Sequence, residues 1–152
     1  AAVVEVVGTR LYDNVLGGEL TAGDNEYRCY CIKNTHATLS AQTMKIYLSL
    51  DEANAQQDIS FAVEVPTASD TAGYAQGPLA NEGTAPTVGS GNVSAWSDAV
   101  TYGTGIGVNQ GSHDANLDAG EIVFVWTRRT VNASSSAASN DRVIIASAFD
   151  TE

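Results

Sequence analysis

Two segments of the chain alternate between apolar and polar residues, and they constrain the fold more than any other feature. In residues 44–50 the apolar positions are Met44, Ile46, Leu48 and Leu50. In residues 59–65 they are Ile59, Phe61, Val63 and Val65. A period of two is typical of a β-strand with one face in the core and the other in water. Both segments are therefore predicted to be strands. Their inward side chains are predicted to form the centre of the core: Ile46, Leu48, Phe61 and Val63.

The segment before the first of these strands has a different pattern. Residues 27–32 (YRCYCI) carry aromatic and cysteine side chains at both alternating positions, which favours a strand covered on both faces. A polar connection, residues 33–43, joins it to the strand at 44–50. The two strands can be an antiparallel pair or a link between two packed sheets, and either arrangement starts a sandwich core.

Short apolar runs predict further strands along the rest of the chain. They are residues 3–7, 10–16, 122–128 and 143–149, with weaker candidates at 93–96 and 100–102. Residues 132–140 (NASSSAASN) are predicted to be a polar hairpin tip or a mobile loop. Residues 67–92 are an excursion that is long for a connection inside a compact domain. We therefore expect an all-β chain that folds as one antiparallel β-sandwich domain, residues 1–152, with about seven or eight strands and long loops.

One short pattern occurs twice. Residues 20–24 (LTAGD) precede the strand predicted at Tyr27, and residues 117–121 (LDAGE) precede the strand predicted at Ile122. Both read leucine, any residue, alanine, glycine and an acid. We expect the same turn in both places.

The charge of the chain limits its partners. Seven Lys and Arg stand against 18 Asp and Glu, so the net charge is −11. A surface of this sign repels phosphate backbones and anionic lipids, which argues against nucleic acid or membrane as a partner. Acidity of this kind also favours solubility and resists self-association.

Cys29 and Cys31 are the two cysteines of the chain. Two residues apart on a strand, their Cα atoms are about 6.5–7 Å apart, at or beyond the edge of unstrained disulfide geometry. We expect both to be reduced, buried and slow to react. Free thiols favour folding in a reducing compartment such as the cytoplasm.

Residues 111–121 (GSHDANLDAGE) gather five metal-ligand or acidic side chains: His113, Asp114, Asn116, Asp118 and Glu121. Their spacing resembles a calcium loop but lacks the glycine and glutamate that an EF-hand requires. An acidic turn before a strand and a looser calcium turn both remain open. No nucleophile motif of the Gly-x-Ser-x-Gly type occurs. Glu19, Asp24 and Glu26 are spread too evenly to nominate a carboxylate pair. We predict no catalytic residues, no metal site and no cofactor.

Arg128 and Arg129 are adjacent and follow Trp126. On a strand they point to opposite faces, so they cannot form one bidentate clamp. Pairing of one with an acidic neighbour, while the other covers Trp96 or Trp126, is one expectation. Contact of one of them with an acidic surface of a partner protein is the other.

Four pieces of the sequence resemble a recurrent domain encoded by tailed bacteriophages. They are residues 23–29 (GDNEYRC), 33–39 (KNTHATL), 45–49 (KIYLS) and 119–131 (AGEIVFVWTRRTV). Proteins of that group are usually virion structural components with an immunoglobulin-like sandwich, so the resemblance implies that fold and no catalytic residues. Residues 132–134 depart from the pattern, because a proline-glycine turn is expected after the paired arginines.

A short acidic β-domain of this kind looks most like a capsid decoration, or cement, protein. The resemblance implies a virion protein on the capsid exterior, assembled in the host cytoplasm. Its implied partners are the major capsid protein and copies of itself, as a homotrimer. Two alternatives remain: a tail, neck or baseplate component, and a carbohydrate-binding module. The second would expose Trp96, Trp126 and several tyrosines as a flat platform.

The predicted partner contacts lie in three regions. Residues 1–7 are an N-terminal arm or an edge strand, in which Val3, Val4 and Val6 could add to a neighbour's sheet. Arg128 and Arg129 are the second region, and the excursion at 67–92 is the third.

Overall fold

The computed structural model describes most of the predicted core and leaves both chain ends aside. The described residues are 12, 17–51, 56–65, 81–89, 93–134, 136 and 143–150. The arm at residues 1–7, with Val3, Val4 and Val6, lies outside them, as does most of the excursion at 67–92. Within the described residues the elements are α1 (Gly17–Ala22), β1 (Asp24–Lys33), β2 (Gln42–Leu50), β3 (Gln57–Glu64), β4 (Ile106–Gly107), β5 (Ile122–Val131) and β6 (Ile144–Asp150).

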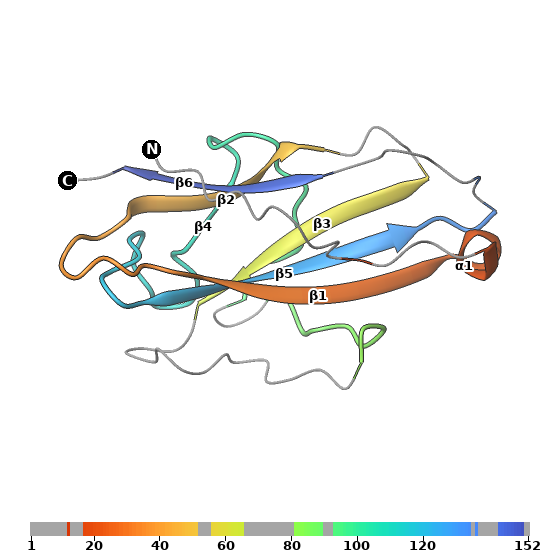
Figure 1. Cartoon of the computed structure of the whole chain (residues 1–152), viewed down its shortest axis with the longest axis horizontal. Helices are drawn as coiled ribbons and strands as arrows, with labels where there is room; N and C mark the ends of the chain where they lie inside the picture. The colour runs from red at the N-terminus through yellow and green to blue at the C-terminus, as the bar shows by residue number, and fades with distance from the viewer. Residues whose placement is uncertain are drawn as a thin grey trace.

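The strands form two antiparallel sheets of three strands each. The first sheet has the order β1-β5-β3 and the second β4-β2-β6. Figure 1 shows β2 and β6 in one layer and β1, β5 and β3 in the other, with α1 at one end. The all-β prediction is confirmed. The link between 27–32 and 44–50 joins two sheets, which decides between the two alternatives left open. β5 and β6 belong to different sheets and do not pair as a hairpin, and most of the predicted tip at residues 132–140 lies outside the described residues.

The core lies between the sheets. The second sheet contributes Met44, Ile46 and Leu48, and the first sheet contributes Phe61, Val63, Val123 and Val125. Ile46, Leu48, Phe61 and Val63 are all fully buried, so the core prediction from the two alternating segments is confirmed.

Leu50 breaks the alternation of the first segment. The register between β2 and β6 shifts between Leu48 and Leu50, so that Leu48 lies opposite Ile145 and Leu50 opposite Ile144. Two residues of β2 therefore face one residue of β6, and such a bulge re-aims the side chains beyond it. Leu50 is 36% exposed, and its predicted inward position is wrong.

The coverage of β1 and β3 is the reverse of the prediction. Ser60, Ala62 and Glu64 were expected to face water, but all three are buried. The outer edge of β3 is bonded to the segment 93–97 through the bridges Phe61–Ser97 and Glu64–Val93. β1 was expected to be covered on both faces, but it is an edge strand whose Cys29 and Cys31 are exposed.

The two repeated turn sequences share a left-handed glycine but not the rest of the turn. Gly23 and Gly120 have φ angles of 79° and 86°, in the left-handed region that favours glycine. A Cβ at Gly23 would also lie 3.1 Å from the carbonyl oxygen of Val131. The expectation of a shared turn is confirmed for the glycine, although α1 precedes Gly23 and an irregular turn precedes Gly120.

The two leucines on either side of the bulge make a matched stability test. Leu48→Ala should lower the free energy of unfolding by about 2–5 kcal/mol, because it leaves a cavity in the core. Leu50→Ala should cost about 1 kcal/mol or less, because its side chain is partly in water. Urea denaturation of both variants measures the difference. Equal losses of unfolding free energy in the two variants would show that the bulge is not where the structure has it.

Candidate functional site

Arg128 and Arg129 lie on opposite faces of the first sheet, as predicted. Arg128 lies directly opposite Tyr27 of β1 and Ser60 of β3 in the sheet. Arg129 lies directly opposite Glu26 of β1 and Ile59 of β3. Cross-strand partners share a face, so one arginine faces outward with Tyr27. The other faces the second sheet.

The outward arginine belongs to a group that we call the outer-face cluster: Tyr27, Trp96 and Arg128. The Arg128 guanidinium carbon lies 5.1 Å from the centre of the Trp96 ring, and the Tyr27 and Trp96 ring centres are 6.0 Å apart. Arg128 Nε donates a hydrogen bond of 3.0 Å to Ser60 Oγ. All three residues of the cluster are half-buried, so each still presents surface to solvent.

The inward arginine is committed to an internal pair. The Arg129 guanidinium forms an ion pair with Glu26, and both residues are buried. The prediction that one arginine pairs with an acid while the other covers a tryptophan is confirmed. A partner contact by Arg129 would require this pair to open. The partner-contact role therefore stays a prediction for Arg128.

Tyr12 packs against the arginine of the buried pair. Its ring lies 5.1 Å from the Arg129 guanidinium carbon and 5.7 Å from that of Arg28. Its hydroxyl donates a hydrogen bond of 2.6 Å to Thr127 Oγ1. Burial raises the pKa of the Tyr12 phenol far above its ordinary value, and the hydrogen bond with Thr127 opposes that shift only in part. Tyr12 thus stays neutral, and its hydroxyl and ring contacts attach it to the first sheet.

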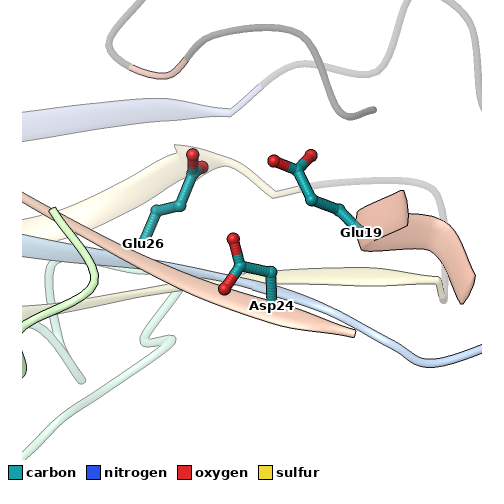
Figure 2. A group of neighbouring side chains, drawn as sticks. All are labelled: Glu19, Asp24 and Glu26. Atoms are coloured by element: carbon teal, nitrogen blue, oxygen red, sulfur yellow. The ribbon is translucent and has the colours of Figure 1, made fainter. Parts of the chain in front are cut away.

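The carboxyl groups of Glu19, Asp24 and Glu26 converge where α1 meets β1. Ligand atoms of the three residues lie within 4.8 Å of one another, and Figure 2 shows the three side chains turned toward a common point. Their even spacing in the sequence nominated no carboxylate pair, and the close grouping of the three side chains shows that this inference is wrong. The chain reverses at Gly23, which brings α1 back against the start of β1.

Carboxylate oxygens of this kind are suitable ligands for a hard cation such as Ca²⁺. The Arg129 guanidinium already neutralises one of the three carboxylates through its pair with Glu26. Three acids near one arginine are therefore also explained as a charge network within the fold. The signal that could have revealed them is the turn glycine between Glu19 and Asp24.

The acidic loop at residues 111–121 is held together by its own side chains. The Asp118 amide donates to Glu121 Oε2 at 2.7 Å, and the Asn116 amide donates to Asp114 Oδ1 at 2.8 Å. His113 Nε2 lies 3.4 Å from Glu121 Oε2. The carboxylates thus stabilise an acidic turn before β5.

Cys29 and Cys31 share the outer face of β1 and are free thiols. Their predicted burial is wrong, because β1 is an edge strand and not a central one. Cys29 is exposed as a residue, but protein atoms around its sulfur still disfavour the charged thiolate. Burial raises its pKa to about 12, and the Glu64 carboxylate and Cys31 add to the shift.

The two tryptophans do not form a flat exposed platform. Trp126 is 3% exposed, and its indole N–H donates a hydrogen bond of 2.6 Å to the buried Glu64 carboxylate. Trp96 is half-buried between Tyr27 and Arg128. Of the two tryptophans, Trp96 alone presents appreciable ring surface to solvent.

No protein-family model matches the chain, and searches of curated proteins and of solved structures returned no match. Among the described residues, no helix combines the length and hydrophobicity needed to cross a bilayer.

The adjacent arginines provide a second matched pair of variants. Arg129→Ala should lower the free energy of unfolding by about 3–5 kcal/mol, because it leaves the Glu26 charge buried without its guanidinium. Arg128→Ala should cost about 1 kcal/mol or less, because its ion pair with Asp58 is partly exposed and long, at 3.9 Å. Thermal and urea unfolding measure both. A larger cost for Arg128→Ala would reverse the assignment of faces.

The raised pKa of Cys29 predicts its reactivity. In a Cys31→Ser variant at pH 8, burial of the Cys29 thiol, the largest cause of its raised pKa, should still hold its thiolate fraction well below that of an ordinary cysteine with a pKa of about 8.5. Alkylation by iodoacetamide, followed by mass spectrometry, should therefore be slow in the folded chain and fast in urea. Equal rates in the two conditions would contradict the desolvation of this thiol.

Proposed function

We propose that this chain is a non-enzymatic virion structural protein that decorates and stabilises the outer capsid shell of a tailed bacteriophage. In this proposal it binds the major capsid protein on the capsid exterior and assembles on the particle in the host cytoplasm. The proposal rests on the sequence resemblance to phage structural domains. It includes the finer fold that the resemblance implies, an immunoglobulin-like sandwich, with residues 1–7 as an arm or a further strand.

The outer-face cluster is the structural observation that supports a protein-binding role. Tryptophan, tyrosine and arginine are the residues most enriched among those that dominate binding energy at protein interfaces. Here Tyr27, Trp96 and Arg128 lie together on the outer side of a rigid sheet and remain half-buried. Trp96 and Ser60 already hold the Arg128 side chain in one position, so less freedom is lost when a partner binds.

The charge of the cluster indicates the chemistry of the partner surface. Arg128 places a guanidinium on a molecule of net charge −11. Its ion pair with Asp58 is long, and the guanidinium carries more N–H donors than this pair and Ser60 use. The expected partner surface therefore presents carboxylates or backbone carbonyls to Arg128, with an apolar side chain against Trp96.

Self-association completes the proposal. A cement protein that forms a homotrimer would present three such clusters to neighbouring capsomers, and a closed ring of three is a common symmetry for oligomers. Several weak contacts held on one particle bind far more tightly than each contact alone.

The experiment is a capsid occupancy assay. The double variant Trp96→Ala/Arg128→Ala should lose most of its occupancy on purified capsids, measured as copies per particle by electron cryomicroscopy. Lys45→Ala is the matched control, because Lys45 also contacts an aromatic ring, that of Tyr102, but lies on the second sheet. It should bind as the unmodified chain does.

Three outcomes would contradict the proposal in different ways. Full occupancy by the double variant would show that the outer-face cluster is not part of the binding surface. A few copies per particle, located at one vertex or on the tail, would favour a tail, neck or baseplate component over a shell protein. Binding to glycans that is lost in Trp96→Ala, with no binding to capsids, would favour the carbohydrate-binding alternative.

A further inference from the structure

The edges of the two sheets are protected to very different degrees. The outer edge of β3 is bonded to the segment 93–97, and β4 is only two residues long. On the outer edge of β1, the Tyr27 amide donates a hydrogen bond to the Glu82 carbonyl. β1 also carries charged side chains, including Arg28 and Lys33. Short length, added pairing and charge are common protections against unwanted strand addition.

β6 has none of these protections among the described residues. It runs for seven residues, and its sequence IIASAFD is uncharged until Asp150 at its end. It pairs with β2 on one side, and no described strand pairs with it on the other. An uncharged edge strand of this length is a template for another strand.

The register identifies which backbone groups of β6 face the open edge. In β2, the Leu48 amide donates to Ala99 and the Met44 carbonyl accepts from Val108, on the side away from β6. The odd-numbered residues of β2 therefore point their backbone groups toward β6, where Lys45 pairs with Ala148 and Tyr47 with Ala146.

The alternation then extends along β6 itself. Ala146 and Ala148 bond to β2, and the amides between and beside them point to the open edge: Ile145, Ser147 and Phe149.

Tyr12, the described residue nearest in sequence to the N-terminal segment, lies near this edge. Tyr12 is bonded to Thr127 and packed on Arg28, on the face of the first sheet that looks toward the second sheet. Because β4 contacts β3, β6 at the other edge of its sheet lies on the β1 side, where Arg28 is.

The distance between the two sheets is short compared with the reach of the chain. Packed sheets are about 10 Å apart, and the five residues from Val7 to Tyr12 span up to about 17 Å when extended. The chain's own residues 3–7 can therefore reach β6, and their attachment through Tyr12 gives them a high effective concentration there.

We infer that the outer edge of β6 is the docking site of the chain's own residues 3–7, which add to the second sheet as a further strand. The valines of VVEVV have high β propensity. β6 turns the amides and carbonyls of alternate residues toward an edge on which no described strand pairs. Docking would cover an edge that otherwise invites aggregation. This inference does not depend on the proposed role in a virion.

The test is residue-resolved amide hydrogen exchange by NMR on the full chain and on a variant of equal length. The variant carries Val3→Ser, Val4→Gly, Val6→Ser and Val7→Gly. The amides of Ile145, Ser147 and Phe149 should be protected in the full chain and should lose at least about tenfold of that protection in the variant. The amides of Ala146 and Ala148 bond to β2 and serve as controls within the same strand, so they should stay protected.

The remaining outcomes would overturn the inference. Fast exchange at Ile145, Ser147 and Phe149 in the unmodified chain would show an open edge. Protection that persists in the variant would show that another segment covers β6. Protection that rises with protein concentration, together with dimers in light scattering, would assign the added strand to a second copy. If the fourfold variant unfolds, Val6→Pro alone, which removes one donor from the arm, replaces it in the same comparison.

Discussion

The pairing of β5 with strands on both of its sides determines the placement of almost every feature described above. β5 is the middle strand of the first sheet, so its register is set by two ladders, with β1 and with β3. Its odd-numbered residues, such as Val125 and Arg129, face the second sheet. Its even-numbered residues, such as Trp126 and Arg128, face outward. A slip of one residue would exchange these two sets, exposing Val125 and Arg129 and turning Arg128 and Trp126 into the core.

Polar contacts on both faces oppose such a slip. Arg129 meets Glu26 on the inner face, and Trp126 meets Glu64 on the outer face. A buried ion pair adds little net stability when compared with apolar packing of the same shape, because both charges lose their water. A register that separated Arg129 from Glu26 would leave two buried charges without partners, which costs far more. We therefore regard these pairs as determinants of register, which the loss of stability in Arg129→Ala addresses.

The parts of the fold that could be predicted from the sequence are those that local pattern controls. Alternation identified β2, β3 and the core residues Ile46 and Leu48, and the glycine in each repeated turn was recognised from its neighbours. Leu50 could not be placed, because a bulge depends on how β2 meets β6 and not on β2 alone. The outer face of β3 was predicted to be exposed to solvent because its residues are small or polar. Whether another segment covers that face depends on the tertiary structure and not on the local pattern. The local sequence pattern also did not predict the convergence of Glu19, Asp24 and Glu26, because it follows from a chain reversal at Gly23.

The strong negative charge of the chain bears on where a partner can approach. A net charge of −11 opposes the approach of a second copy or of another acidic protein. Close approach is least opposed where local charge is absent or positive. β6 is uncharged from Ile144 to Phe149, and the outer-face cluster carries the guanidinium of Arg128. These two regions lie on different sheets, so a strand docked on β6 would leave the cluster free. A chain built this way can protect its vulnerable edge and still present one rigid face to a partner.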